Sequence, residues 1–358
     1  MATIPLLDVS GSPTELGEAH GESFRDLIAE HIACHREWIF EFAAIPLDGE
    51  KLDALWQPWI DANEAAAPEL VDEMRGIARG AGVPFEHVFQ LNSLLDLGNF
   101  RWMDCIRETV GCTCFVVPHE AGSGKTLLGQ TYDLSAFRRS FNIVLRVNPQ
   151  DGPTQLVYSL AGMVGLAGLN EHGLGININY LSSNDCQPGL LHAAIVRQVL
   201  GASNLADAVA VPTGVTRAGG SHYMIADDAG HVISVETTAE RFALAYPDGE
   251  PYGHTNHYLS DWLQPVQVVR PSSIGSSIAR YTALRRFLQR EDLDLDVLKS
   301  MTADHSSYPR SICAHGGPDE PDQYRGSTIA AMIQVLGERT MHICGGCACE
   351  SPYEAITL

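Results

Sequence analysis

The stretch Gly111-Cys112-Thr113-Cys114-Phe115-Val116-Val117 marks the point where the character of the chain changes. Its β-branched and aromatic residues predict a strand. Residues 120–125 have the composition of a turn, and residues 126–133 predict a second strand, so the two strands should form a hairpin. We expect this hairpin to begin a sheet of the protein.

The chain before the hairpin has a helical pattern. Ser12-Pro13-Thr14-Glu15 resembles a capped helix start, and apolar residues recur after it at spacings of three and four. A further helix is predicted from Glu69 to Ala81, since two glycines follow its apolar face. The helical pattern extends to about Asn92. We therefore predict that residues 1–111 are a helical prosegment.

The chain after the hairpin alternates between strands and helices. Strands are predicted at 142–147, 155–159, 165–169, 175–180, 222–227, 232–237, 241–246, 328–335 and 340–344, and helices at 192–200, 205–210 and 276–289. Strands in meanders, then helices, then strands again, favour an α+β fold of two sheets with helices outside. With no internal repeat or low-complexity linker, residues 112–358 are predicted to form one compact unit.

Composition excludes several classes of protein. The 358 residues carry a formal charge of -21 that is spread along the chain, and no run of Lys and Arg offers a phosphate-binding stripe, so nucleic acid is not an expected partner. The longest apolar stretch, Leu156–Leu169, is interrupted by glycines and too short to cross a bilayer, so no membrane partner is expected. Nine cysteines without a secretory signal favour a reducing cytoplasm. A homo-oligomer remains open.

The Gly111-Cys112 bond lies at the head of the first predicted strand, where the Cys112 thiol can attack the carbonyl carbon that precedes it. Gly111 has no Cβ, which would let the backbone adopt a strained conformation for that attack. Hydrolysis of the resulting thioester would free the α-amine of Cys112. An α-amine has a pKa of about 7.7–8.0 and can accept the thiol proton, so no histidine is required as a base. The sequence thus predicts a self-cleaving cysteine nucleophile that acts on amide or thioester carbonyls.

A set of short motifs, in order along almost the whole chain, supports this hypothesis. The chain resembles the acyl-coenzyme A:6-aminopenicillanic acid acyltransferase family of autoproteolytic N-terminal-nucleophile (Ntn) hydrolases. More distantly, it is similar to penicillin V acylases and bile salt hydrolases. The motifs that carry the resemblance are 10–17 with His20-Gly21, 75–83, Leu91-Asn92, 111–113, 129–133, 168–170, 173–175, 254–257, Tyr308-Pro309 and 311–313.

The resemblance implies a four-layer αββα sandwich and assigns roles to individual residues. Cys112 would be the nucleophile and Asp133 would orient its thiol and amine. Asn256 and Asn179 would help to line the oxyanion hole. The distant hydrolases have an arginine where Gln130 stands, so a charged contact to the nucleophile is expected to be absent here.

The resemblance also predicts the ligands of the protein. Substrates would be small-molecule amides, amines or acyl-CoA, the acceptor of the acyl group being water or an amine, and no cofactor is expected. The α and β fragments, 1–111 and 112–358, should stay associated. The family usually has an arginine after Ser-Ile-Cys, whereas Ala314 follows Cys313 here, so Arg310 would at most be a displaced substitute.

Other interpretations of the same residues remain open. The chain can be an unprocessed, catalytically silent binding protein on the same scaffold. Cys344, Cys347 and Cys349 have a spacing that can chelate zinc, but no fourth ligand is evident nearby. We therefore expect no metal and take these three cysteines as structural or redox-sensitive, with a cysteine-rich metal-binding protein as a further alternative. His254 and His257, on either side of Asn256, are expected to be packing or hydrogen-bonding partners.

Overall fold

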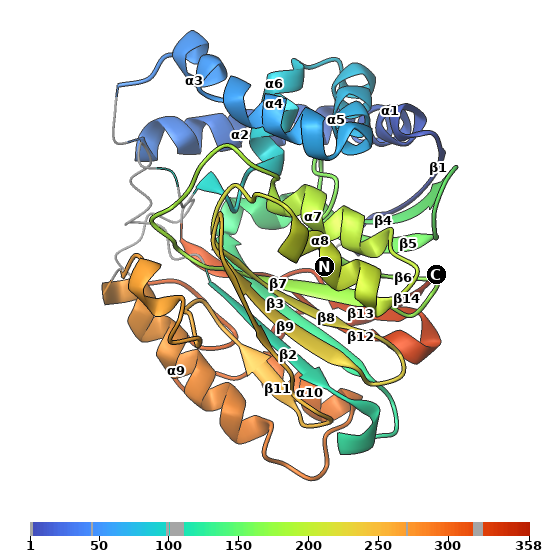
Figure 1. The fold of residues 1–358 in the computed structure, drawn as a ribbon, viewed down its shortest axis with the longest axis vertical. Coiled ribbons are helices and arrows are strands. Elements are labelled where there is room, and N and C mark those ends of the chain that lie inside the picture. Colours follow the sequence, from blue (N-terminus) through green and yellow to red (C-terminus); the bar gives the residue numbers. More distant parts are fainter. Residues whose placement is uncertain (1–2, 44–45, 98–99, 101–110, 270, 318–324) are drawn as a thin grey trace.

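The protein is described here from a computed structural model, which covers residues 3–43, 46–97, 100, 111–269, 271–317 and 325–358. Within these residues the strands form two sheets that pack face to face (Figure 1). The eight-stranded sheet has the order β1-β4-β5-β6-β7-β8-β9-β10, and the six-stranded sheet has the order β11-β2-β3-β12-β13-β14. Contacts of β2 and β3 with β7 join the two sheets at the centre of the molecule.

The predicted hairpin forms the middle of the six-stranded sheet. Strand β2 pairs antiparallel with one edge of β3, and β12 pairs antiparallel with its other edge. Every residue of β2 and β3 is buried, because helices cover one face of this sheet and the second sheet covers the other. This sheet consists of β2 (Gly111–Val117), β3 (Leu127–Ser135), β11 (Tyr252–His254), β12 (Gly326–Val335), β13 (Thr340–Cys344) and β14 (Glu354–Thr357).

The eight-stranded sheet is antiparallel except at one edge, where β1 pairs parallel with β4. Its strands are β1 (Leu6–Gly11), β4 (Asn142–Pro149), β5 (Gln155–Leu160), β6 (Ala167–Asn170), β7 (Gly175–Tyr180), β8 (Ser221–Ala226), β9 (Val232–Thr237) and β10 (Phe242–Ala245). Between β6 and β7, Gly173 has a φ of +79°, as the predicted turn requires.

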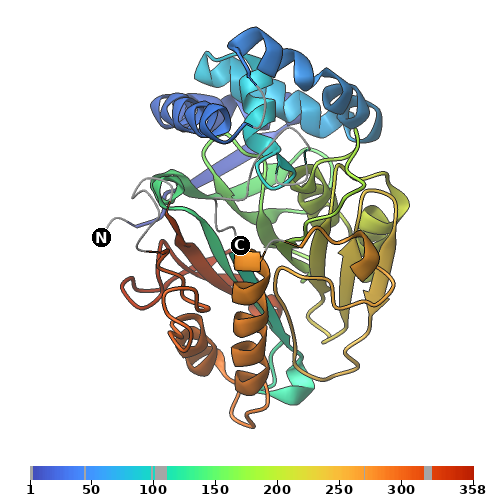
Figure 2. The same ribbon diagram turned by 90° about the vertical axis from the view of Figure 1, so that its left-hand side faces the viewer.

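Helices cover both outer faces, which gives the four layers expected of an αββα sandwich (Figure 2). Helices α7 (His192–Leu200) and α8 (Leu205–Gly214) pack on the eight-stranded sheet. Helices α9 (Pro271–Phe287) and α10 (Leu295–Thr302) pack on the six-stranded sheet. The predicted α+β class and sandwich are thus confirmed. None of the described helices is both long and apolar enough to span a membrane.

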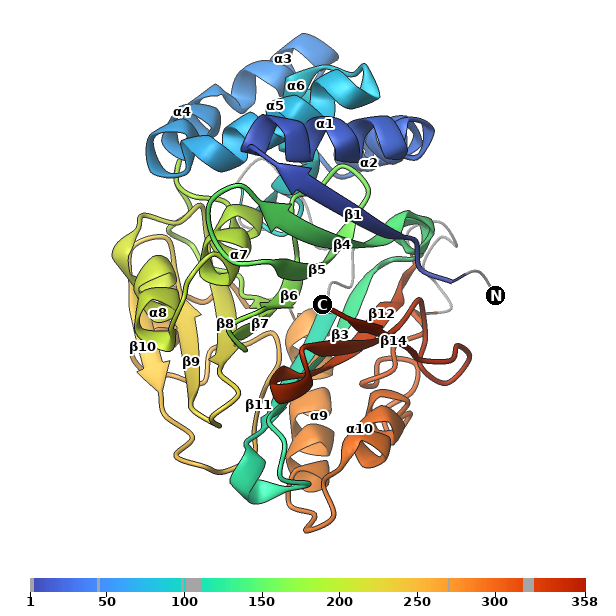
Figure 3. The ribbon, with the colours of Figure 1, turned by 90° about the vertical axis from the view of Figure 1, so that its right-hand side faces the viewer.

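The N-terminal segment adds a helical cap above one end of the sandwich (Figure 3). Its helices are α1 (Pro13–Ser23), α2 (Arg25–Phe42), α3 (Gly49–Leu55), α4 (Gln57–Ala66), α5 (Pro68–Ala81) and α6 (Phe85–Asn92). The predicted start of the first helix is correct in detail: Ser12 accepts from the Glu15 amide, and the Glu15 carboxylate accepts from the Ser12 amide.

Two predictions about the elements were wrong. The residues before Ser12 were given no element, yet Leu6–Gly11 forms strand β1 at the edge of the eight-stranded sheet. The helix predicted at 276–289 was taken as the last, whereas α10 follows it at Leu295–Thr302. The β1 pairing means that residues 1–111 and 112–358 share one sheet. The N-terminal segment is therefore an integral part of the fold.

Candidate active site

Cys112 lies at the beginning of β2, next to the interface between the two sheets. It stands opposite Tyr132 of β3, and its side chain is fully buried. Burial, followed by the nearby Asp133 carboxylate, raises the pKa of the Cys112 thiol to about 12. The Arg280 guanidinium and the backbone N–H groups of Asp133 and Tyr180 oppose this rise. In the intact chain the thiol is therefore protonated at neutral pH.

The side chains of Asn256 and Asn179 hold the backbone of Cys112 from two sides. The Cys112 amide donates to Asn256 Oδ1 at 2.9 Å, and Asn179 Nδ2 donates to the Cys112 carbonyl oxygen at 3.0 Å. Asn256 follows β11, and Asn179 belongs to β7 of the other sheet. The structure thus brings three of the four predicted catalytic residues into direct contact, although the two asparagines are far from Cys112 in sequence.

Arg280 of α9 supplies a charge that the sequence analysis did not expect. Its Nη1 donates to the Cys112 carbonyl oxygen at 2.6 Å and to Thr113 Oγ1 at 3.1 Å, and its Nη2 donates to Asn256 Oδ1 at 2.8 Å. The prediction of no charged contact at the nucleophile was therefore wrong. Position 130 is glutamine, and the charged contact comes instead from a helix of the outer layer.

Asp133, the fourth predicted residue, lies opposite Gly111 on β3 and is 2% exposed. Thr328 Oγ1 donates to its Oδ1 at 2.7 Å, whereas Oδ2 has no hydrogen-bond partner. Burial raises the pKa of Asp133 to about 6, even though Arg280 and the Thr328 hydrogen bond lower it. A buried carboxylate with one free oxygen and a pKa near neutrality is suited to accept a proton.

The structure gives a different reason for glycine at position 111 from the one predicted. Gly111 is a regular strand residue and is not among the described glycines with positive φ, so backbone strain is not what requires it. A Cβ there would lie 2.8 Å from Asp133 Oδ2 and 3.2 Å from Arg280 Nη2. Glycine is required because the free carboxylate oxygen lies against the backbone at this position.

A chain of polar side chains fixes the position of Asn179. Its Oδ1 accepts from His222 Nδ1 at 2.8 Å and lies 3.1 Å from His254 Nδ1, while the rings of the two histidines stack at 3.7 Å. His254 Nε2 lies 2.8 Å from the Glu236 carboxylate. His257 lies 2.7 Å from Ser277 Oγ. The prediction that His254 and His257 are hydrogen-bonding partners is confirmed.

Gln130 joins the two sheets beneath the site. Its Nε2 donates to the Ile178 carbonyl oxygen at 2.6 Å, and its Oε1 accepts from the Ile178 amide at 2.9 Å. This pair of bonds satisfies the backbone of β7 in the way that a neighbouring strand would. Gln130 therefore fixes the spacing between β3, which carries Asp133, and β7, which carries Asn179.

The cavity next to the site is small in the intact chain. It has a volume of about 20 Å³ and is lined by Tyr180, Ser182, Asn256, Gln267, Val268, Ser273 and Ile274. A water molecule needs roughly 10–15 Å³ measured in this way, so the space holds little more than one water. A larger cavity, of about 1270 Å³, lies beside Tyr252 and Arg285, and none of the predicted site residues lines it.

Comparison with known proteins identifies the family. The model of the acyl-coenzyme A:6-aminopenicillanic acid acyl-transferase family matches residues 120–347. The chain belongs to this family. Acyl-coenzyme A:6-aminopenicillanic-acid-acyltransferase, 40 kDa form, of Emericella nidulans is 23% identical over 333 residues, which are 90% of this chain and 87% of that protein. As a member of the acyltransferase family, the protein is an enzyme that acts on amide bonds.

Two solved structures are also similar to this chain. A conjugated bile acid hydrolase from Clostridium perfringens, in a C2A mutant, is 13% identical with a TM-score of 0.45 and covers 69% of this chain and 92% of its own. Penicillin V acylase from Agrobacterium tumefaciens is 15% identical with a TM-score of 0.38. The match covers 65% of this chain and 82% of that protein.

Sequence reasoning missed two residues of the site, Arg280 and Thr328. Arg280 lies in a predicted helix with other arginines nearby, and only the packing of α9 on β2 distinguishes it from them. Thr328 lies at a register shift in the pairing of β12 with β3, which is visible only once the strands are paired. Neither residue has a local sequence signal.

Proposed function

We propose that the chain is the precursor of a cysteine Ntn enzyme that cleaves its own Gly111-Cys112 bond. The observation that carries this proposal is the contact of Gly111 with Asp133. A carboxylate oxygen without a hydrogen-bond partner lies against the residue whose carbonyl would be attacked, and its pKa of about 6 leaves it ionised at neutral pH. The thiol that must lose a proton is on the next residue.

In the proposed first step, Asp133 accepts the Cys112 thiol proton while the sulfur attacks the carbonyl carbon of Gly111. The C–N bond then breaks, the proton passes to the Cys112 nitrogen, and a thioester joins Gly111 to the sulfur. Water hydrolyses this thioester, which leaves a carboxylate on Gly111 and returns the thiol. Asn256 Oδ1 already accepts from the Cys112 nitrogen and would keep holding it as an amine.

After cleavage, the free amine takes over as the base for the same thiol, because its pKa is about 7.7–8.0. We propose that Cys112 then forms an acyl-enzyme from an amide or an acyl-CoA thioester and passes the acyl group to water or to an amine. The Asn179 amide nitrogen donates to the Cys112 carbonyl oxygen, and the Asn256 amide nitrogen donates to the nearby Tyr180 carbonyl oxygen. We propose that these two donors turn to the oxyanion during the reaction and stabilise it. Among the described residues, the cavity next to Asn256 is too small for such a substrate, which fits a zymogen.

The two fragments are expected to remain associated as one complex in a reducing cytoplasm. Buried bonds cross between them, including the bidentate pair of Glu73 with Arg197 at 2.7 and 3.0 Å. Asn92 of the prosegment also bonds the Gly162 carbonyl oxygen and the Val164 amide. The described cysteines are all free thiols, which fits a reducing compartment.

Denaturing mass spectrometry of the purified protein tests the self-cleavage. Two fragments that meet at Gly111/Cys112 are expected for the natural chain, and a single chain of 38.8 kDa for Cys112→Ala. Cys112→Ser is expected to cleave slowly, because an oxygen nucleophile can perform the same acyl shift. A matched thiol variant, Cys114→Ala on the same strand, should cleave normally. A single chain in catalytically active natural protein would refute the proposal.

A further inference from the structure

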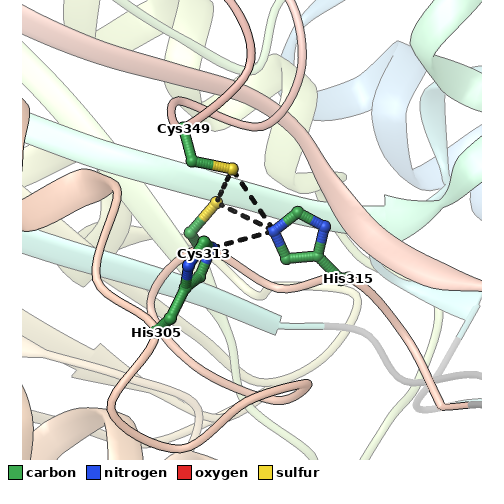
Figure 4. Close-up of side chains that lie close together, drawn as sticks. All are labelled: His305, Cys313, His315 and Cys349. Carbon is green, nitrogen blue, oxygen red and sulfur yellow. Dashed lines mark hydrogen bonds between the residues drawn. The ribbon is translucent and has the colours of Figure 1, made fainter.

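Four potential metal ligands from separate segments meet at one point on the outer side of the six-stranded sheet. His305, Cys313 and His315 come from the loop between α10 and β12, and Cys349 comes from the turn after β13 (Figure 4). All four ligating atoms lie within 4.8 Å of one another. Cys313 is buried, His315 is half-buried, and His305 and Cys349 are exposed, so solvent reaches the cluster from one side.

The distances within the cluster match those of a tetrahedral metal site. The two sulfur atoms are 3.7 Å apart, and His315 Nε2 lies 3.6 Å from Cys313 Sγ and 3.4 Å from Cys349 Sγ. With zinc bonds of about 2.3 Å to sulfur and about 2.0 Å to nitrogen, a regular tetrahedron requires S···S of about 3.8 Å and S···N of about 3.5 Å. Cys313, His315 and Cys349 are thus already spaced for one ion.

The two imidazoles depart from this spacing. The Nε2 atoms of His305 and His315 are 2.9 Å apart, whereas a tetrahedral zinc site places two nitrogens about 3.3 Å apart. His305 is exposed, so a small rotation of its side chain is sufficient to open this distance.

The loop that carries three of the ligands is fixed by its own hydrogen bonds. The Cys313 amide donates to the Asp304 carbonyl oxygen at 3.1 Å, and the His315 amide donates to the Pro309 carbonyl oxygen at 2.9 Å. The other ring nitrogen of His315, Nδ1, lies 3.8 Å from Cys347 Sγ and 3.9 Å from the Glu350 carboxylate. The Glu350 side chain is exposed, and a small movement would let it accept a hydrogen bond from this nitrogen, which would orient the ring as a ligand.

We propose that His305, Cys313, His315 and Cys349 bind one zinc ion in a Cys₂His₂ site that joins the 305–315 loop to the turn after β13. Two thiolates and two imidazoles in tetrahedral geometry favour zinc over magnesium or calcium, which prefer oxygen ligands. Each thiol releases one proton to solvent on binding, so the two thiolates neutralise the charge of the ion. With four protein ligands, the site is structural.

This site departs from the expectation of no metal. The sequence showed three cysteines, Cys344, Cys347 and Cys349, but no fourth ligand, because the other ligands come from a separate loop earlier in the chain. Only Cys349 belongs to the cluster. The Cys344 thiol donates to the Ser351 carbonyl oxygen at 3.4 Å, and Cys347 Sγ faces the Ala314 and Thr328 carbonyl oxygens at 3.5 and 3.6 Å.

The site lies one hydrogen-bonded step from the candidate active site. The amide of Ala314, between the ligands Cys313 and His315, donates to Thr328 Oγ1 at 2.9 Å. The same hydroxyl donates to Asp133 Oδ1 at 2.7 Å. A zinc ion bound by Cys313 and His315 would fix Ala314 between them. It would therefore hold Thr328, the hydrogen-bond donor of the Asp133 carboxylate, in place. The zinc proposal itself does not depend on self-cleavage, since no ligand belongs to the active site.

Metal analysis of untagged full-length protein, kept reduced and dialysed against buffered zinc, tests the site. We expect one zinc per chain. With Co²⁺ in place of zinc, we expect thiolate-to-cobalt charge-transfer bands and the strong visible absorption of tetrahedral cobalt. His305→Asn and Cys349→Ser change exposed ligands and should leave the fold intact. Each should lower zinc affinity at least about tenfold, since even loss of a supporting contact around a metal costs about 10–100-fold.

Controls separate the site from other thiols and from the active site. Cys34→Ser on α2 and Cys112→Ala should bind zinc as the natural chain does. Three results would overturn the proposal: no zinc retained, zinc binding unchanged in both ligand variants, or no thiolate-to-cobalt absorption.

Discussion

Replacing Asp133 with asparagine should stabilise the folded chain while it stops self-cleavage. The carboxyl group has a pKa of about 6 in the fold against 3.8 as an ordinary aspartate. A difference of about two pKa units corresponds to about 3 kcal/mol. Because the folded pKa is the higher one, the native state binds more protons than the unfolded chain between pH 3.8 and about 6, and stability falls as the pH rises through this window.

Asparagine cannot ionise, so the free energy of unfolding of the Asp133→Asn chain does not fall as the pH rises through this window. The cost of the ionised carboxylate is absent below pH 3.8 and complete above about pH 6. The free energy of unfolding of Asp133→Asn, relative to Asp133, should therefore rise by about 3 kcal/mol between pH 4 and pH 8. The Thr328 hydrogen bond survives the change, since Oδ1 remains an acceptor. Stability given up at a site for the sake of activity is a common feature of enzymes.

Urea unfolding across this pH range measures the effect. Both chains should carry Cys112→Ala, so that cleavage does not complicate the comparison. Asp261→Asn, at an exposed position, controls for the loss of one negative charge. Parallel stability curves for the chains with and without Asp133→Asn would refute the reasoning, because the carboxylate would then be no more costly in the fold than in water.

Three further predictions follow from other contacts. Gly111→Ala places a Cβ 2.8 Å from Asp133 Oδ2, and the displacement should slow self-cleavage by about 100-fold, measured by the loss of intact chain with time. Arg280→Gln removes a charge that lowers the pKa of Asp133, so the midpoint of the pH dependence of cleavage should move above about 6. Glu73→Gln breaks the buried pair with Arg197 and should weaken fragment association by about 3–5 kcal/mol, seen as separation at lower urea concentration in gel filtration.

Matched variants show whether these effects are specific. The Cβ added by Gly337→Ala meets no atom within 4 Å, so this variant should cleave at the natural rate. Arg285→Gln, on the same helix as Arg280, should leave the pH midpoint unchanged. An unchanged midpoint in Arg280→Gln would contradict the electrostatic account of the site. Fragments of Glu73→Gln that separate no earlier than natural ones would contradict the role given to the buried pair.

Local patterns in the sequence predicted most of the fold, because most of its elements are internally consistent. The β2-β3 hairpin has strand-forming residues on both sides of a turn, and α5 has an apolar face followed by glycine. Strand β1 has no such signal. It is short, mostly exposed or half-buried, and pairs with a strand more than a hundred residues later. Pairing of this kind is fixed by the assembled sheet.

The residues of the candidate site also divide into those with a local sequence signal and those placed only by the folded structure. Cys112 and Asp133 could be found from the position of Gly111-Cys112 and from family motifs, since adjacent strands bring them together. Arg280 and the zinc ligands could not, because each contact joins segments that meet only in the folded protein. Three of the four ligands lie in a loop that contains no recognised metal-binding spacing, and the fourth comes from the turn after β13.

The most direct test of the central claim is peptide mapping of active natural protein after incubation with a panel of acyl-CoA thioesters and N-acyl amines. The account predicts a fragment that begins at Cys112 with a free α-amine, and an added acyl mass on the sulfur of that residue. Active enzyme in which Cys112 is still joined to Gly111 by an intact peptide bond would contradict it, since the thiol would then need another base.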